Sequence, residues 1–272
     1  MITPTLLLAS LPFNAPEPGG FHAPGPDIFE LPPLWEGAPS WLTKPTLLAV
    51  LSAVILVVLF WGAFGNPKLV PRGLQNIGEI GYMFVREQVG RPFLGKDTDR
   101  FMPLLVSIFF MVLVWNLMGV FPFIQFPVAS HIAFPIVLAV SVYLLRIVLG
   151  MKIQGPIGFF KNMMFPPGVP KAVYILLAPI EFLSNLILAP ATHALRLFAN
   201  MFAGHMILAF FSAVGFYFIF EDFGLLGLPV GILGTVMTIL MTALEIFIQF
   251  LQAFLFAMLA AMYIGNALHA EH

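Results

Sequence analysis

The stretch GLLGLPVGILGTVMTILMTALEIFIQFLQAFLFAMLAAMYIGNAL, from Gly224 to Leu268, carries a single charged residue, Glu245. A helix of this length would reach about 68 Å, whereas the hydrocarbon core of a bilayer is about 30 Å thick. A second apolar run extends from Ala172 to Phe220, and Pro179 and Pro190 allow breaks only near its start. We therefore predict two long, strongly tilted helices, at about 224–268 and 172–220, that pack against protein inside a membrane.

The composition of the whole chain also indicates an integral membrane protein. Of its 272 residues, 60% are hydrophobic and 9% are charged, whereas soluble domains carry about 25% charged residues. The apolar runs are unbroken and lack the alternation of barrel strands, which predicts helices. The net charge of −1 and the lack of a basic run exclude nucleic acid as the main partner. With no cysteine, the chain has no disulfide and no thiolate metal site.

Further apolar segments complete a predicted all-α fold with five membrane-crossing helices and one interfacial helix. Uncharged or nearly uncharged spans lie at about 46–64, 101–121 and 131–150. At 72–90, apolar side chains recur at helical spacing among charged ones, which predicts an amphipathic helix at the membrane surface. We expect a charged loop at 91–100.

The N-terminal residues differ from the rest of the chain. Residues 1–43 hold nine of the 24 prolines and no Lys or Arg, which predicts an extended, non-cytoplasmic tail that adds nothing to the core. Residues 44–272 are then the membrane domain.

Lys and Arg alternate between the two predicted sides of the membrane. The tail has none, and the later connections carry six at 65–100, none at 122–130, three at 150–171 and none at 221–223. Because cytoplasmic loops are enriched in Lys and Arg, the N-terminus should lie outside and the C-terminus in the cytoplasm.

The first long run carries ionisable residues at membrane depth. A charge at the bilayer centre costs about 2.5–3.5 kcal/mol, so we expect such residues to serve a function. Arg196 stands out because a guanidinium stays charged in proteins. At 100° per residue, His193, Arg196 and Asn200 lie within about 100° of arc, which predicts a stripe that faces a protein partner or a water-filled cleft. His205 lies about 180° from Arg196 and faces a different neighbour.

The last run carries a second polar face. Glu245, Gln249 and Gln252 share it at positions i, i+4 and i+7. This face can line a hydrated path, along which a carboxylate and the His205 imidazole can relay protons. Glu181 can instead satisfy a polar group between packed helices. Nothing provides the three or four ligands of a metal site.

Two parts of the sequence resemble a known family. LRLFANMFAGH, at 195–205, closely resembles the signature of subunit a of F-type ATP synthases. The closing helix, with Glu245, LQAF at 251–254 and MYI at 262–264, is similar to the last helix of that family. LVP at 69–71 and WNLMG at 115–119 are looser similarities.

The resemblance implies roles for particular residues. Arg196 matches the stator arginine that faces the rotating ring of c subunits and meets the ring carboxylate, and Asn200 and Gln252 match polar residues beside it. His205 and Glu245 occupy the two positions where the family often places an acid and a histidine, in the half-channel open to the non-cytoplasmic side.

The resemblance also implies the surroundings of the chain. Its partners would be the c-ring proteolipids, the peripheral-stalk b subunits, the lipid bilayer and, indirectly, the catalytic head. No cofactor is implied, and the location would be a bacterial plasma membrane. Three features depart from the family: Ala189 stands where a basic residue is common before Pro190, His193 stands where small or hydroxyl residues are common, and Glu181 is spaced one residue further from Pro190.

Two other functions use the same residues. A stand-alone proton channel or secondary transporter would also need ionisable groups inside the membrane. A membrane assembly scaffold would use the polar stripe only to join helices. The chain has no GxxxxGK[ST] loop, so it is not expected to carry out nucleotide chemistry itself.

Overall fold

The computed structural model describes residues 21–268 except 30, 36, 38, 122–123, 166–169, 171–172, 222–223 and 226, so residues 1–20 of the predicted tail lie outside the described residues. Within the described ranges the only β pairing is an isolated bridge between Pro33 and Thr43. Five helical segments are long and apolar enough to cross a membrane: Lys44–Phe64, Leu74–Val120, Ala133–Gln154, Tyr174–Phe220 and Gly227–Leu268. The predicted all-α membrane fold with five crossing segments is confirmed.

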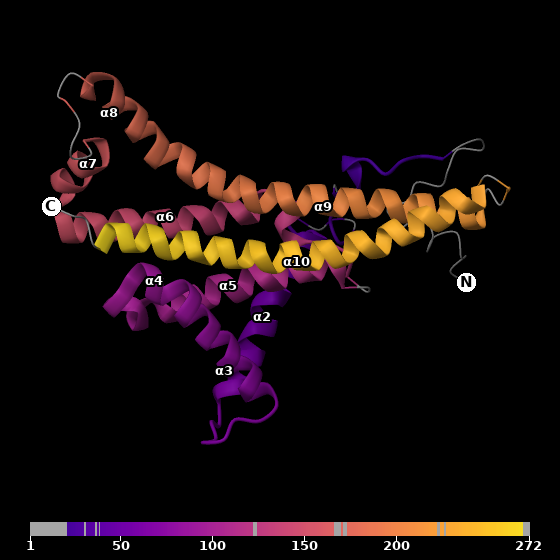
Figure 1. Ribbon diagram of the computed structural model, residues 1–272, viewed down its shortest axis with the longest axis horizontal. Helices are drawn as coiled ribbons and strands as arrows, with labels where there is room; N and C mark the ends of the chain where they lie inside the picture. Colours follow the sequence, from indigo (N-terminus) through magenta and orange to yellow (C-terminus); the bar gives the residue numbers. More distant parts are fainter. Residues whose placement is uncertain are drawn as a thin grey trace.

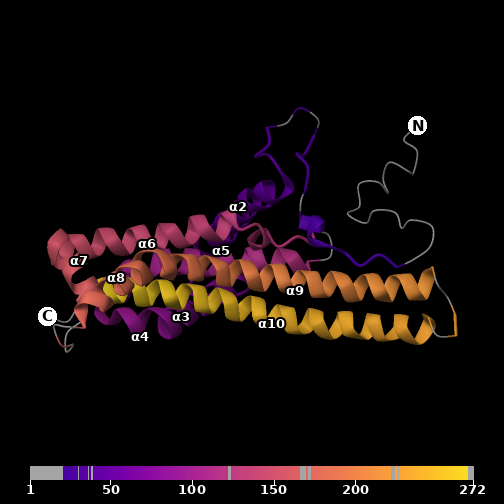
Figure 2. The ribbon, with the colours of Figure 1, turned by 90° about the horizontal axis from the view of Figure 1, so that it is seen from above.

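Two helices, α9 (Ala189–Phe220, 32 residues) and α10 (Gly227–Leu268, 42 residues), form the long axis of the molecule. They lie side by side in both ribbon views (Figures 1 and 2). Near the turn that joins them, glycines let the backbones touch, since a Cβ at Gly234 would lie 2.8 Å from the backbone nitrogen of Gly215. At 1.5 Å per residue α10 is about 63 Å long. The predicted length is confirmed, and the tilt in a bilayer stays a prediction.

A wide turn connects α9 to the helix before it. α8 (Tyr174–Leu183) continues into α9 through a π turn, η5 (Ser184–Leu188), in which the N–H of Ala189 donates to the carbonyl of Ser184. Pro190 has no N–H, and its ring crowds the carbonyl four residues earlier. A π turn widens the helix at that point. The break allowed by the sequence is therefore a local widening, and the chain stays helical through it.

The stretch expected as a charged loop at 91–100 is largely helical. α3 (Leu74–Val85) continues through η2 (Arg86–Gly90), α4 (Arg91–Leu94) and η3 (Gly95–Asp97) into α5 (Thr98–Val120). Ion pairs hold this path together. Arg91 contacts Glu87, one turn earlier, at 2.7 Å, and Arg86 contacts Asp99 at 2.8 Å. The amphipathic pattern at 72–90 falls on α3 and η2, and its place at the membrane surface stays a prediction.

The remaining helices surround this framework. α2 (Lys44–Phe64) packs on α3, and the two point away from the long axis, while α6 (Ala133–Gln154) lies along α9 and α10 (Figure 1). The predicted loop at 150–171 contains a further helix, α7 (Pro156–Met164). Gly155 separates it from α6 with φ +74°, and Pro156 suits a first helical position because its missing N–H has no partner there.

The described part of the N-terminal segment does contribute to the core, unlike the sequence prediction. Residues Pro26–Phe29 form a 3-10 turn, η1, and Phe29 is buried with Leu48, Trp115 and Phe126 in the smaller of two apolar clusters. An aromatic ring inside a Pro-rich segment can gain enough from burial to dock the segment. The larger cluster joins α5 and α10 and extends onto α6 and α9.

Candidate functional site

Arg196 lies exposed on one face of α9, with the small side chains Ala199 and Ala203 exposed on the following turns. Within the described ranges it makes no hydrogen bond and no ion pair. A guanidinium cannot lose its charge, so this face presents a permanent cation with room beside it for another helix. Arg196 is therefore on the surface of this chain, and the predicted partner or water-filled cleft that it faces stays a prediction.

His193 differs from the other members of the predicted stripe. It is buried, and its ring lies 3.8 Å from the ring of Phe256 on α10, measured between centroids. The predicted stripe covers about 100° of the helix circumference, so the residue at one edge of it, His193, faces α10. His193 therefore packs behind Arg196 and does not share its exposed face.

One hydrogen bond joins the two long helices beside Arg196. The Asn200 amide nitrogen donates to the side-chain oxygen of Gln252 at 2.8 Å. Asn200 lies at the exposed edge of α9, whereas Gln252 is buried. The two residues that the resemblance places next to Arg196 are thus in contact with one another.

The polar face predicted for α10 is present and buried. Glu245, Gln249 and Gln252 are 4%, 0% and 2% exposed, and all three point into the protein. The Asn116 amide on α5 donates to the backbone carbonyl of Gln249 at 3.3 Å. In the sequence, Asn116 served only as part of the family resemblance. Its position along α5 does not predict a contact with α10.

Glu245 lies against the backbone of α9. A Cβ at Gly204 would be 3.4 Å from Glu245 Oε1 and 3.5 Å from Cδ, so the missing side chain of this glycine makes room for the carboxyl group. Both carboxyl oxygens are buried without a well-oriented hydrogen bond, and the Gln249 side chain is the polar group beside them. A buried carboxyl group with so little solvation is suited to exchange a proton with water or a nearby group.

His205 is the next residue after Gly204 and points to the other side of α9. Its ring lies 5.8 Å from the ring of Phe29 and faces the backbone of Gln125. No hydrogen bond or ion pair joins His205 to Glu245. The structure thus places Glu245 of α10 against Gly204 and directs His205 away from it, so the two side chains are not in contact.

Glu181 belongs to a separate polar cluster at the α8 end of the molecule. The Asn185 amide nitrogen donates to the Glu181 carboxylate at 2.9 Å, and Arg146 on α6 donates to Asn185 at 3.4 Å. The Arg146 guanidinium lies 5.6 Å and 5.4 Å from the rings of Tyr143 and Tyr263. Sequence reasoning missed this cluster because its members come from α6, α8, η5 and α10.

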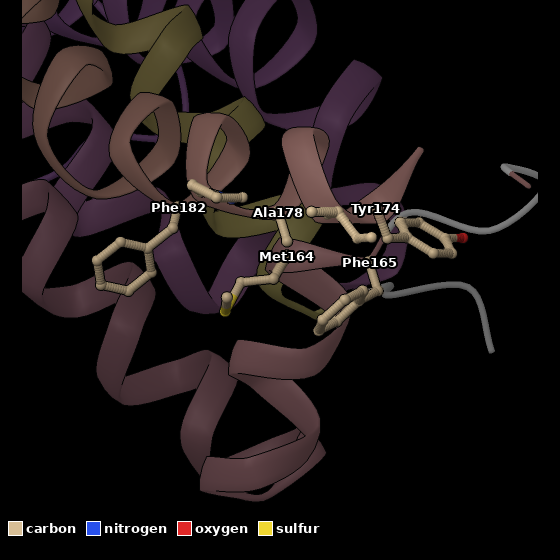
Figure 3. Close-up of a pocket in the computed structure, with 7 residues that line it drawn as sticks. Met164, Phe165, Tyr174, Ala178 and Phe182 are labelled. Atoms are coloured by element: carbon tan, nitrogen blue, oxygen red, sulfur yellow. The ribbon is translucent and has the colours of Figure 1, made fainter. Parts of the chain in front are cut away.

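An apolar pocket of about 460 Å³ lies between α7 and α8 (Figure 3). Met164, Phe165, Tyr174, Ala178 and Phe182 line it. It holds no carboxylate, amine or imidazole, so it is unsuited to proton transfer. Among the described residues no group of three His, Asp or Glu side chains suits a metal ion.

Comparison with known proteins decides the family. The family model described as ATP synthase A chain matches residues 46–265. The chain belongs to the ATP synthase subunit a family. Similar proteins named ATP synthase subunit a include those of Streptomyces lividans, at 45% identity over 74% of this chain and 72% of that protein, and of Nocardioides sp., at 40% over 94% and 96%. The protein from Pseudarthrobacter chlorophenolicus is 39% identical over 97% of this chain and 99% of its own length.

The family match covers every site residue predicted from the sequence, from Glu181 to Gln252. It begins after Phe29 and Lys44, two described residues of the N-terminal region that lie near His205. Neither stood out in the sequence, because an apolar ring in a Pro-rich segment and a single lysine at a helix start carry no motif.

Proposed function

We propose that this chain is the membrane stator subunit of a proton-translocating ATP synthase, and that it guides protons to and from a rotating ring of c subunits. One observation carries the proposal: Arg196, within the family-matched part of α9, is exposed and has no counter-charge among the described residues. Its natural counter-charge is the carboxylate of a ring subunit that passes this face. ATP synthesis or hydrolysis is carried out by other subunits of the complex.

Arg196 has two effects in this mechanism. Its fixed charge stabilises the ionised form of a ring carboxylate, so that the carboxylate gives up its proton on one side of Arg196 and accepts another on the other side. It also repels a proton that would pass straight through the interface. The two half-channels therefore stay separate, and net flow requires rotation of the ring.

The outer half-channel would use His205 and Glu245. Protons from the non-cytoplasmic side reach the buried carboxyl group of Glu245 by way of the His205 turn and pass from there to the ring. After almost a full turn of the ring they leave on the cytoplasmic side. The cytoplasmic half-channel would run near the start of α9. The cluster of Glu181, Asn185 and Arg146 borders that part of the chain, so its polar side chains are candidates to line this second half-channel.

The remaining partners and the orientation follow from the same assignment. The c-ring covers the Arg196 face, peripheral-stalk b subunits hold the chain against rotation, and the catalytic head is coupled through them. The distribution of Lys and Arg places the N-terminus outside and the C-terminus in the cytoplasm. Because the relatives are bacterial, we place the chain in the plasma membrane.

The test is ATP-driven proton pumping by the whole complex reconstituted in vesicles. Arg196→Ala should abolish pumping while the complex still assembles, because no other cation lies on that face of α9 among the described residues. Lys161→Ala, which removes an exposed positive charge from α7, is the control and should pump normally. Coupled pumping by the assembled Arg196→Ala complex would refute the assignment.

A scaffold function is favoured by one observation, the hydrogen bond between Asn200 and Gln252. If the chain is only a scaffold, substitution of Asn200 or Gln252 should reduce assembly of the complex and leave pumping by the assembled complex unchanged. The same reconstitution separates the two functions, since a scaffold would pump normally at equal amounts of assembled complex.

A further inference from the structure

The N-terminal segment folds back onto α9 at the turn that carries His205. Figure 2 shows the indigo segment along α9, and Figure 1 agrees. The Phe29 ring lies 4.7 Å from Phe202, 5.8 Å from His205 and 6.2 Å from Phe126, between ring centroids. Phe29 is 6% exposed. Phe29, which lies before the first membrane span, thus covers part of the surface of α9.

Several contacts hold this segment in place. The backbone N–H of Leu34 donates to the carbonyl of Leu42 at 3.1 Å, next to the bridge between Pro33 and Thr43, which closes the segment into a loop. Lys44, at the start of α2, then donates to the carbonyl of Ile124 at 3.1 Å. These contacts close the segment on itself and tie the start of α2 to the loop before α6.

Among the described residues, the Phe29 ring and the backbone of Gln125 face His205, and the Lys44 ammonium group lies near enough to act on it electrostatically. Of these three described residues, Phe29 is the one that comes from outside the membrane domain, and its ring packs beside the imidazole. An imidazole passes protons along a chain of partners only when each nitrogen is held in a suitable direction. An aromatic ring packed beside it restricts that orientation and keeps lipid out.

We propose that Phe29 is a positioning residue of the outer half-channel, which holds the His205 imidazole against α9 and closes the outer side of that turn. This inference rests on the proposed function, because it takes His205 as part of the proton path. Phe29 itself exchanges no proton.

The experiment measures ATP-driven proton pumping and passive proton flux in vesicles with equal amounts of complex. Phe29→Ala should slow both about tenfold, because a misplaced relay group loses much of its rate. Phe29→Tyr keeps the ring and should retain most of the flux, which a general loss of packing would not predict. Trp35→Ala removes an exposed aromatic ring from the same segment and should leave the flux unchanged. Wild-type flux in Phe29→Ala would overturn the inference.

A double-mutant cycle separates this inference from the proposed function. If Phe29 acts through His205, Phe29→Ala should cause no further loss in a His205→Ala background. Independent, multiplicative losses would overturn the positioning function. Wild-type flux in His205→Ala alone would instead overturn the path through His205, whatever Phe29 does.

A second variant covers the case in which Phe29→Ala does not assemble. The chain has no cysteine, so His205→Cys supplies a unique thiol. Phe29→Leu, which keeps most of the volume but not the ring, should speed labelling of that thiol by an impermeant reagent added outside. Equal labelling rates with Phe and Leu at position 29 would overturn the inference.

Discussion

The contact between Gly204 and Glu245 allows a graded test of the outer half-channel. Gly204→Ala adds a Cβ 3.4 Å from Glu245 Oε1 and 3.5 Å from Cδ. These are ordinary contact distances, so the carboxyl group need not move. We expect the alanine variant to pump within about twofold of wild type, because the relay geometry is kept.

Gly204→Val has a much larger expected effect. Its γ-carbons extend about 1.5 Å beyond the Cβ, so one of them would come to about 2 Å from the carboxyl group if nothing moved. Glu245 must then shift by at least about 1 Å, and a misplacement of that size costs up to about 100-fold in rate. Because Glu245 is buried between α9 and α10, it has little space into which to move.

The assay is proton flux through the reconstituted complex at several outer pH values, with assembly measured in parallel. Gly158→Val is the matched control, since a Cβ there meets only the Gln154 side chain at 3.7 Å and lies far along the chain from Glu245. Wild-type flux in Gly204→Val would refute the idea that protons pass Glu245. An equal loss in the alanine and valine variants would refute the steric argument.

Three further predictions concern other parts of the chain. Asn200→Ala should lower the stability of the α9 and α10 pair by about 1–3 kcal/mol, measured by denaturant unfolding in detergent, because it leaves a buried amide unpaired. His205→Glu combined with Glu245→His should restore more proton flux than either single change, because the pair keeps one acid and one imidazole; equal losses in all three would contradict a shared path. Single cysteines at Asp27 and Lys161 should label from the outside and the cytoplasm respectively with an impermeant reagent, and the reverse would overturn the orientation.

The sequence predicted those features that depend on local periodicity. A run of 45 residues with one charge allows few structures besides a long helix in a membrane, and α10 is such a helix. The shared face of Glu245, Gln249 and Gln252 was also predictable, because three positions on one helix fix their relative direction whatever they contact. The burial of all three on that face agrees with this pattern.

Charged stretches were harder to interpret than apolar ones. Residues 91–100 carry enough charge to resemble a loop, yet Arg86 pairs with Asp99 across the stretch and keeps it compact. The Lys-containing stretch at 150–171 likewise contains α7, which starts at Pro156. In both cases a partner or a helix-start residue outweighs the polar composition, and composition alone does not show it.

Contacts between distant residues were not predictable from one sequence. Phe29, which precedes α2, lies beside His205 on α9, and Arg146 on α6 donates to Asn185 in η5. No periodicity encodes either pair. His193 was placed in the Arg196 stripe by angle alone, but the boundary between the exposed and the buried face of α9 falls between them. That boundary depends on where α10 packs, which only the structure provides.

In the proposed outer path, the separation of His205 from Glu245 sets an order. His205 lies under the N-terminal segment, on the face of α9 away from Arg196, whereas Glu245 lies between α9 and α10. A proton that arrives from outside would therefore meet His205 first and must pass around α9 to reach the carboxyl group. Gly204 is the residue of that turn that lies against Glu245, and because it has no side chain it leaves space there. In the proposed path, a water or a side-chain rotation at this turn would complete the transfer, so we expect Gly204 to serve proton movement as well as helix packing.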